Sequence, residues 1–409
     1  MTAATAGRIT SADHAVAVAA ELAHEFAPGA AARDRDRELP YAQLDRLASS
    51  GLLAITVPAA FGGADLAPSV VTEVVRILAV ADPNIAQIPH SHFVYVNLLR
   101  LAGTDEQRRR YFGAVLAGAR IANAQSERGG RTITEISTTL RPVDGEFRID
   151  GTKYYCTGSL FADLLAVLTR LDDPDERSGL PAGEYIAYLP TRTSGVRIVD
   201  DWNGFGQRTT GSGTVELADV RVRAEQLVPR AKALTGPTAY GAYAQLLHAA
   251  IDTGIARGAL TAATEFVRKH ARPWFEAGVE RAVDDPLLIQ RFGELVVTVA
   301  TAEATLAAAA TAVDSAVHAP GGDADERGAA ARASLAVATA KIVADRAAVE
   351  VSAALFEVSG TRSAAADLNL HHFWRNARTH TLHDPVRWKY HHLGRALLHD
   401  SPPPAHGTF

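Results

Sequence analysis

The sequence predicts an α+β protein with an N-terminal α-helical domain, a middle β domain and a C-terminal helical bundle. Two changes of residue pattern along the chain support this order. Before residue 119, alanine-rich segments carry apolar residues three to four positions apart, which is the period of an amphipathic helix. Short strand-like runs, separated by turn signals such as Asp144-Gly145 and Asp150-Gly151, extend to about residue 230, and helical periodicity then returns. We therefore expect domains over residues 1–119, 120–230 and 231–409.

The same patterns predict the individual elements. The clearest N-terminal helices are expected at residues 44–53, 69–80 and 105–116. Strands are expected at residues 121–125, 138–142, 147–150, 164–169, 185–190, 196–199 and 213–217. So many short strands in a small region are typical of a β-sandwich or barrel. Long alanine-rich helices, typical of an antiparallel bundle, are expected at residues 242–269, 287–317 and 329–355.

The composition excludes several classes of protein. A net charge of −5 without a concentrated basic stripe argues against nucleic-acid binding. A single cysteine, Cys156, excludes an intrachain disulfide and a cysteine-based zinc cluster. The first residues lack a signal-peptide pattern, and no run of about 18 apolar residues is apparent. We therefore expect a soluble, cytoplasmic protein with no membrane partner.

Residues 373–394, FWRNARTHTLHDPVRWKYHHLG, concentrate polar side chains near the C-terminus. Pro385 disfavours helical geometry at the residue before it, so His380, His383 and Asp384 should lie in a last helical turn and the bend that follows. Because histidine exchanges protons near neutral pH, this group indicates one wall of a polar pocket. The alternative is a solvated helix end whose cations complement the helix dipole.

A second polar group lies in an otherwise apolar N-terminal segment. Residues 84–97, NIAQIPHSHFVYVN, carry Gln87, His90, His92 and Tyr95. Isolated histidines of this kind are more often core residues than catalysts. Their closeness in sequence nevertheless indicates that at least one of them lines a cavity.

Seven strings, taken together and in this order, resemble the acyl-CoA dehydrogenase superfamily. They are ASSGLLAITVPAAFGG (48–63), ANAQSE (122–127), DGTKYYCTGS (150–159), DDWNGFGQRTTGSG (200–213), ARPW (271–274), FEVSGTR (356–362) and RNARTHTLHDPV (375–386). The match is closer to the flavin-dependent monooxygenase branch, of the dibenzothiophene and sulfone monooxygenase type. The resemblance covers about residues 15–398 and implies a C-terminal four-helix bundle.

The resemblance implies a flavin site. Positions around the flavin ring correspond to Asn123, Ser126, Thr157, Gly158 and Ser159, with Tyr155 able to stack nearby. Arg272, with Trp274 in the same string, and Arg362, with Gly360 and Thr361, resemble phosphate-binding positions. Arg272 is expected to reach the flavin of a neighbouring subunit of a homotetramer. Without the other strings, a polar hairpin end and surface arginines would be the default interpretation. No G-x-G-x-x-G follows a strand, so a nucleotide site of that type is not supported.

The implied activity is that of a two-component monooxygenase. Reduced FMN from a separate NAD(P)H:flavin reductase would react with O₂ to give a C4a-hydroperoxide, which oxygenates a small organosulfur compound or an amine or aromatic compound. His383 and His380 are the candidate proton donors, with Asp384 orienting an imidazole and His92 as a further candidate. The expected substrate pocket contains Gln87, Tyr95, Trp202 and Phe205.

Two other functions remain open. Asp384 falls at the base position of an FAD-dependent acyl-CoA dehydrogenase, although Pro-Val rather than Gly-Thr follows it. The other alternative is a metal-binding protein that uses the histidines. However, His380-Thr-Leu-His383-Asp384 lacks the H-E-x-x-H spacing that places two ligands on one helix face, and we expect no metal.

Overall fold

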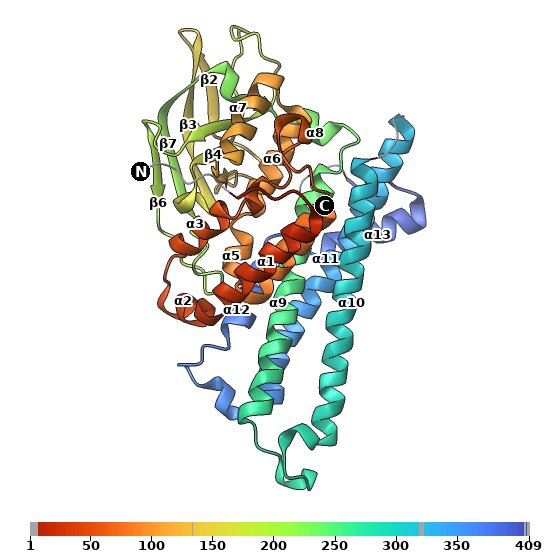
Figure 1. Ribbon diagram of the computed structural model, residues 1–409. Coiled ribbons are helices and arrows are strands. Elements are labelled where there is room, and N and C mark those ends of the chain that lie inside the picture. The colour runs from red at the N-terminus through yellow and green to blue at the C-terminus, as the bar shows by residue number, and fades with distance from the viewer. Residues whose placement is uncertain (1–6, 133, 319–322, 405, 407–409) are drawn as a thin grey trace.

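The computed structural model describes residues 7–132, 134–318, 323–404 and 406 (Figure 1). Seven helices come first: α1 (Ala12–Phe26), α2 (Ala30–Asp36), α3 (Tyr41–Ser49), α4 (Pro68–Ala81), α5 (Pro83–Gln87), α6 (His90–Ala102) and α7 (Asp105–Leu116). Short polar or proline signals begin several of them. Thr104 and Gln107 form a capping box on α7, and Asp82 caps the first turn of α5 ahead of Pro83.

Eight strands form one mixed sheet in the middle of the chain. They are β1 (Ile121–Ala124), β2 (Thr139–Val143), β3 (Glu146–Cys156), β4 (Leu164–Leu171), β5 (Glu184–Pro190), β6 (Val196–Val199), β7 (Gly213–Val222) and β8 (Leu227–Pro229). Their order is β6-β7-β3-β2-β4-β5-β8, and β1 pairs with β4 in parallel. The expected β domain is therefore confirmed. Asp150-Gly151 is not the turn that the sequence suggested, because β3 continues through it with a register shift against β7.

The sheet has an internal core and a helix-covered face. Along β4, Leu165 and Val167 belong to a cluster shared with β2, β3 and β7, whereas Ala166 and Leu168 point the other way and join the helical core. This alternation follows from the two-residue period of a strand. Cys156, at the end of β3, is completely buried in the cluster inside the sheet.

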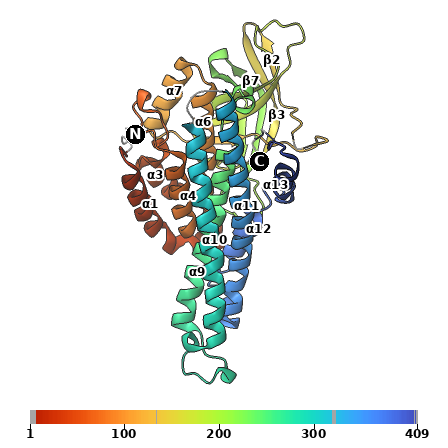
Figure 2. The same cartoon turned by 90° about the vertical axis from the view of Figure 1, so that its right-hand side faces the viewer.

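The C-terminal part consists of α8 (Ala231–Thr235), α9 (Tyr240–His270), α10 (Pro286–Val317), α11 (Asp323–Ser359), α12 (His372–His380) and α13 (Arg387–His399). The long helices α9, α10 and α11 pack side by side and extend beyond the rest of the molecule (Figures 1 and 2). Helices α12 and α13 return against α11. The expected helical bundle is confirmed, and α12 and α13 are much shorter than α9, α10 and α11.

Helix α10 departs from the expectation that no segment is apolar enough to cross a membrane. By length and composition alone, α10 is long and apolar enough to cross a membrane, and one third (33%) of its most apolar 18-residue window is buried. Core helices of soluble proteins can have the same length and composition. Here α10 packs against α9 and α11 and leaves part of its apolar surface exposed.

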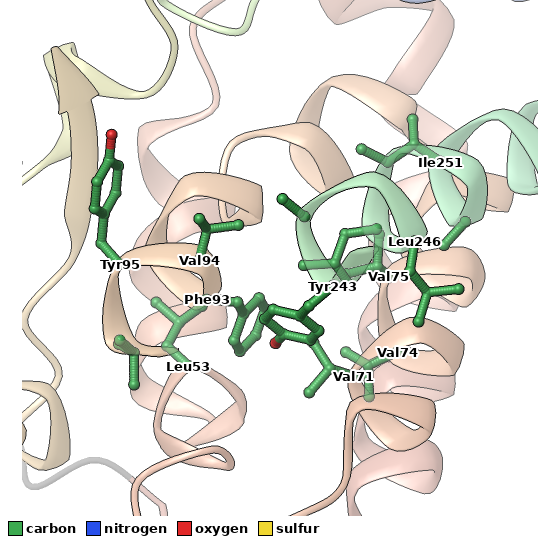
Figure 3. Packing of buried hydrophobic residues seen from close by; sticks show 14 of the residues in the cluster. Leu53, Val71, Val74, Val75, Phe93, Val94, Tyr95, Tyr243, Leu246 and Ile251 are labelled. Carbon is green, nitrogen blue, oxygen red and sulfur yellow. The ribbon is translucent and has the colours of Figure 1, made fainter. Parts of the chain in front are cut away.

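The main core joins the N-terminal helices to α9. Figure 3 shows Val71 and Val75 of α4, Phe93 of α6, and Tyr243 and Leu246 of α9 meeting in one apolar layer. Two glycines of α9 allow α4 to approach closely. A Cβ atom at Gly254 would lie 2.5 Å from the Cβ of Ala79 and 2.7 Å from the carbonyl oxygen of Arg76. This contact fixes the position of α9 along α4.

We expect Gly254→Ala to destabilise the protein by about 1–3 kcal/mol, because the added methyl group overpacks the contact between α4 and α9. The matched control is Gly113→Ala on α7, an exposed position where an added Cβ meets nothing within 4 Å. There the better helix propensity of alanine should stabilise the protein by up to about 1 kcal/mol. Urea unfolding of both variants measures the difference. Equal changes in both would contradict the close packing of α4 on α9.

Candidate active site

Four histidines from three parts of the chain meet at one place. His248 of α9 lies between the rings of His90, at the start of α6, and His383, just after α12, with ring centroids 4.0 Å away on each side. Its Nδ1 is 2.9 Å from Nε2 of His380, the last residue of α12. His90 binds the carbonyl oxygen of Ala244 through Nε2 at 2.9 Å. The structure thus brings together His380 and His383, both predicted from the sequence, with His90 and with His248, which was not predicted.

A buried group of charges lies behind this histidine cluster (His90, His248, His380 and His383). Nδ1 of His380 is 2.7 Å from Oδ1 of Asp252, and Oδ2 of Asp252 is 3.1 Å from Nζ of Lys341. Lys341 also pairs with Asp345. The side chains of His380, Asp252 and Lys341 are fully buried. The triad of Asp252, Lys341 and Asp345 therefore joins α9 to α11, and its link to His380 fixes the end of α12.

The charges of the triad are balanced by a shared proton. Burial raises the pKa of Asp345 to about 8, and the neighbouring Asp252 carboxylate adds to the effect while the Lys341 ammonium opposes it. For Lys341, burial lowers the pKa, but the two carboxylates outweigh burial and raise it above its ordinary value. Burial also raises the pKa of Asp252, but the Lys341 ammonium and a hydrogen bond with Asp345 oppose this effect. Near neutral pH the proton therefore belongs to Asp345, and Asp252 is the carboxylate that pairs with the Lys341 ammonium.

Asp384 is a second buried carboxylate, and it holds His383. Its Oδ1 is 3.0 Å from Nδ1 of His383, and its Oδ2 is 2.8 Å from Nζ of Lys389 on α13. Burial alone would raise the pKa of Asp384, but the hydrogen bond from His383 and the charges of Lys389 and Lys341 lower it well below its ordinary range. An ionised Asp384 accepts the Nδ1 proton of His383. The His383 side chain is 45% exposed and keeps Nε2 for proton exchange.

Loop 204–212 lies directly on α12. The backbone N–H of Gln207 donates to Oδ1 of Asn376 at 2.6 Å, and a Cβ at Gly206 would lie 1.9 Å from the carbonyl oxygen of Arg375. Only glycine permits that approach. Arg375 secures the same contact by donating to the carbonyl oxygen of Phe205 at 2.7 Å and by pairing with Asp34 of α2.

Several buried polar atoms near this contact have no partner among the described residues. They are Oε1 of Gln87, Oδ1 of Asn123, Nε2 of Gln207, Nδ2 of Asn376 and Oγ1 of Thr379. These atoms lie around loop 204–212. Gly158 packs against Ile88 and Ala122, the sequence neighbours of Gln87 and Asn123. The N–H of Gly158 donates to the carbonyl oxygen of Thr210 in the loop at 3.0 Å. Buried polar groups are normally hydrogen-bonded, so this group of amides and a hydroxyl points to a polar ligand.

The flavin-ring positions predicted in the β domain lie around the same loop. Thr157 bonds to Ser212 at 2.8 Å, and the buried hydroxyl of Ser159 is 3.5 Å from the carbonyl oxygen of Gly211. Gly158 has φ +81, a conformation that favours glycine. Ser126 contacts β3 through its backbone, which accepts a hydrogen bond from Tyr154 N–H at 2.9 Å.

The aromatic side chains expected near the flavin and in the pocket are more open. Tyr155 is 47% exposed and meets Trp202 edge to face at 6.2 Å. Phe205 is 50% exposed and its ring centroid is 6.2 Å from that of Trp374. The guanidinium of Arg128 lies over the ring of Tyr155 at 4.9 Å. These residues form an aromatic surface beside loop 204–212.

Two predicted site residues are structural. His92 has both ring nitrogens engaged by the backbone, because Nδ1 accepts from Ile121 N–H at 3.1 Å and Nε2 is 2.8 Å from the carbonyl oxygen of Leu53. It has no nitrogen left for proton transfer, so the prediction that it is catalytic is wrong. Tyr95 belongs to the hydrophobic core, and its hydroxyl donates to Gln125 at 2.9 Å. It supports the sheet and does not line a pocket.

The predicted phosphate-binding residues lie at the far end of the bundle. Arg362 donates to the carbonyl oxygen of His270, the last residue of α9, at 2.9 Å. Arg272 and Trp274 are exposed in the segment just beyond, and Gly360 and Thr361 are exposed beside Arg362. At a rise of about 1.5 Å per residue, His248 and His270 lie about 33 Å apart along α9. Within one chain, these residues and the histidine cluster cannot contact the same flavin.

Sequence reasoning missed His248, Asp252, Lys341, Asp345, Gln207 and Asn376. For four of them the sequence contains a recognisable spacing pattern. His248 and Asp252 are four residues apart in a helix of mainly apolar residues, and so are Lys341 and Asp345. Ionisable residues on the same apolar helix face, at a spacing that brings them together, indicate a buried polar network.

We expect Lys341→Met to destabilise the protein by about 3–5 kcal/mol, because it leaves a buried carboxylate unpaired. Urea unfolding at pH 7 measures this loss.

Asp345→Asn should behave differently. The pKa of Asp345 is about 8 in the folded protein and 3.8 when unperturbed, so the folded state binds this proton more tightly. The contribution of Asp345 to the free energy of unfolding of the wild type therefore falls as the pH rises from about 4 to about 8, whereas asparagine has no proton to lose. In urea unfolding at pH 4, 6 and 8, the free energy of unfolding of Asp345→Asn should increase relative to that of the wild type as the pH rises. A constant difference would contradict this.

Two family models match the chain: "Acyl-CoA dehydrogenase, N-terminal domain" over residues 13–119 and "Acyl-CoA dehydrogenase, C-terminal domain" over residues 246–388. Dibenzothiophene monooxygenase of Rhodococcus qingshengii is 32% identical over 95% of this chain and 94% of that protein. A probable FMNH2-dependent monooxygenase, SfnC of Pseudomonas putida, is 34% identical over 95% and 96%. The crystal structure of TdsC from Paenibacillus sp. A11-2 with FMN and indole superposes with a TM-score of 0.90 at 31% identity, covering 97% of this chain and 99% of that one. The chain belongs to the acyl-CoA dehydrogenase superfamily, in its flavin-dependent monooxygenase branch.

Proposed function

We propose that this protein is the oxygenase component of a two-component, FMN-dependent monooxygenase that acts on a small organosulfur compound. The observation that carries the proposal is the group of unpartnered buried amides and hydroxyl beside loop 204–212. The names of the relatives, which include an FMNH2-dependent enzyme and dibenzothiophene monooxygenases, support the choice of cofactor and of substrate class.

The residues present fit the polar edge of a flavin ring. That edge alternates hydrogen-bond acceptors with a donor. The Oδ1 of Asn123 is an acceptor without a donor, and Nε2 of Gln207 and Nδ2 of Asn376 are donors without an acceptor. We infer that these three side chains hold the ring edge, with Thr157, Gly158 and Ser159 lying close to it.

When bound, reduced FMN supplies the electrons with which one oxygen atom of O₂ enters the product and the other leaves as water. The protein's own groups control protons and water. Asp384 fixes the Nδ1 proton of His383, so Nε2 of His383 is free to give or take a proton at the site. The contact between loop 204–212 and α12 closes one side of the site against solvent.

The structure does not favour the alternative of an acyl-CoA dehydrogenase, because Asp384 is poorly suited to act as its catalytic base. Asp384 is only 4% exposed, binds both His383 and Lys389, and has a pKa well below the ordinary range. Both of its oxygens are engaged by these two neighbours, so neither is available to accept a substrate proton. The metal-binding alternative also lacks support, since no group of three or more metal-ligating side chains is suitably arranged within the described residues.

Oxygen incorporation tests the proposal. The protein is mixed with FMN, a separate NADH-dependent flavin reductase, ¹⁸O₂ and a panel of thioethers, sulfones and sulfinates. We expect one ¹⁸O atom in the product, formed only when the reductase is present. Reduction of an electron-accepting dye by an acyl-CoA, without incorporation of ¹⁸O, would overturn the proposal in favour of a dehydrogenase.

We further propose a homotetramer in which Arg272 completes the flavin site of a neighbouring subunit. Two observations support it. Arg272 lies beyond the end of α9, too far from His248 of its own chain to contact a flavin beside it. Helix α10 also exposes apolar side chains that a second copy would cover: Leu287, Ile289, Val296 and Val297. A cytoplasmic location and a separate reductase partner remain predictions.

Subunit complementation tests the shared site. Arg272→Ala and His383→Ala should each lose activity by at least about tenfold as pure proteins, because each removes one half of every site. When the two variants are unfolded together and refolded, mixed oligomers contain sites with both residues intact, and part of the activity should return. Refolding each variant alone is the control. Mixed oligomers, demonstrated with two affinity tags, that stay inactive would show that Arg272 does not act across subunits.

A further inference from the structure

The hydrogen bonds of the histidine cluster have a fixed direction. The Asp252 carboxylate can only accept, so the His380 Nδ1 that lies 2.7 Å from it carries a proton. Burial lowers the pKa of His380 well below its ordinary value, which keeps the ring neutral and leaves Nε2 unprotonated. The Nδ1 of His248, 2.9 Å from that Nε2, must then be the donor.

This direction determines the form of His248. Burial also lowers the pKa of His248 well below its ordinary value, with the neighbouring histidines adding to the effect. A neutral His248 with its proton on Nδ1 has a free electron pair on Nε2. Among the residues that the structure describes, none makes a hydrogen bond to His248 Nε2. The faces of the ring are covered by His90 and His383, so the ring cannot turn without breaking the cluster.

We propose that His248 accepts a proton at Nε2 during turnover, and that His380 and Asp252 are the positioning residues that hold it in this form. The inference rests on the proposed function only for the source of the proton, which is water or a protic group of the bound substrate. It also changes the predicted role of His380, which acts through His248 and Asp252.

The proton movement balances within the chain. The bond between the donor atom and its proton breaks and leaves the conjugate base of the donor in the site. A new N–H bond forms at Nε2 of His248 while its Nδ1–H bond breaks, and that second proton forms a new bond with Nε2 of His380. One positive charge then lies on His380, next to the Asp252 carboxylate. No electrons are transferred, and the reverse movement returns the proton.

Other charged groups surround this relay of His248, His380 and Asp252 and set its pH dependence. They come from every element packed against it: His90 of α6, Lys341 and Asp345 of α11, His383 and Asp384 after α12, and Lys389 of α13. Lys341, Lys389 and the neighbouring histidines disfavour a positive charge on the relay, whereas the carboxylates of Asp252 and Asp384 favour it. Asp252 makes the shortest bond to the histidine that receives the charge.

Neutron diffraction from deuterium-exchanged crystals of the full chain, without flavin or substrate, tests the tautomers directly. We expect deuterium on Nδ1 of both His248 and His380, and none on Nε2 of either. Deuterium on Nε2 of His248 would overturn the proposal. This result does not depend on which reaction the enzyme catalyses, so it is separate from the test of the proposed function.

Kinetics test the use of the relay. His248→Phe keeps an aromatic ring between His90 and His383 but removes both nitrogens, and it should lower kcat by about 100-fold or more. The matched control is His372→Phe, at a buried histidine of α12 outside the cluster, and it should lose less than about tenfold. Quenching of flavin fluorescence on binding shows that each variant keeps its site. A loss below about tenfold in His248→Phe, with flavin still bound, would overturn the proposal.

The pH profile of kcat in Asp252→Asn shows whether Asp252 positions the relay or only supports the fold. Removing the negative charge destabilises a protonated His380, so the acid limb of the kcat profile should move to lower pH. A variant that only loosened the fold would lower the rate without moving the limb. An acid limb at the wild-type pH would contradict the assigned role of Asp252.

Discussion

The polar interior of this protein depends on the buried contact of Asp252 with Lys341. The pair joins α9 to α11 where both helices are otherwise lined by small apolar residues, and the second oxygen of Asp252 holds His380 at the end of α12. Burying charges in this way costs desolvation energy, which the mutual attraction offsets only when the geometry is good. The arrangement therefore suggests that position matters more than net stability. One carboxylate fixes the spacing of two helices and the orientation of a ring that borders the site.

Most of the fold could be predicted because it depends on local patterns. The expected helices at 242–269, 287–317 and 329–355 lie within α9, α10 and α11, and α7 matches residues 105–116. The failures have physical reasons. Strand β8 is only three residues long and depends on pairing with β5, which no local pattern reveals. Asp150-Gly151 has the composition of a turn, but pairing with β7 keeps it in β3.

The site was only partly predictable. His380, His383 and Asp384 were found because they are close together in sequence and precede a proline. His248 was not, because its hydrogen-bonding partner is 132 residues away and its neighbours in sequence are apolar. His92 shows the opposite error, since proximity to His90 suggested a shared role. Successive positions on a helix point in different directions, and His92 faces the backbone of Leu53 and Ile121 while His90 faces His248.

The burial of Cys156 has a practical consequence. It is the one cysteine of the chain, it is completely enclosed by the sheet, and burial raises the pKa of its thiol to about 12. A thiol in that state does not react with maleimides or other surface-labelling reagents under native conditions. A cysteine introduced on loop 204–212 or on the exposed face of α10 would then carry a spectroscopic probe at a single known position, without removal of the natural residue. Movements of that loop, and the approach of one subunit to another, would become measurable in the native protein.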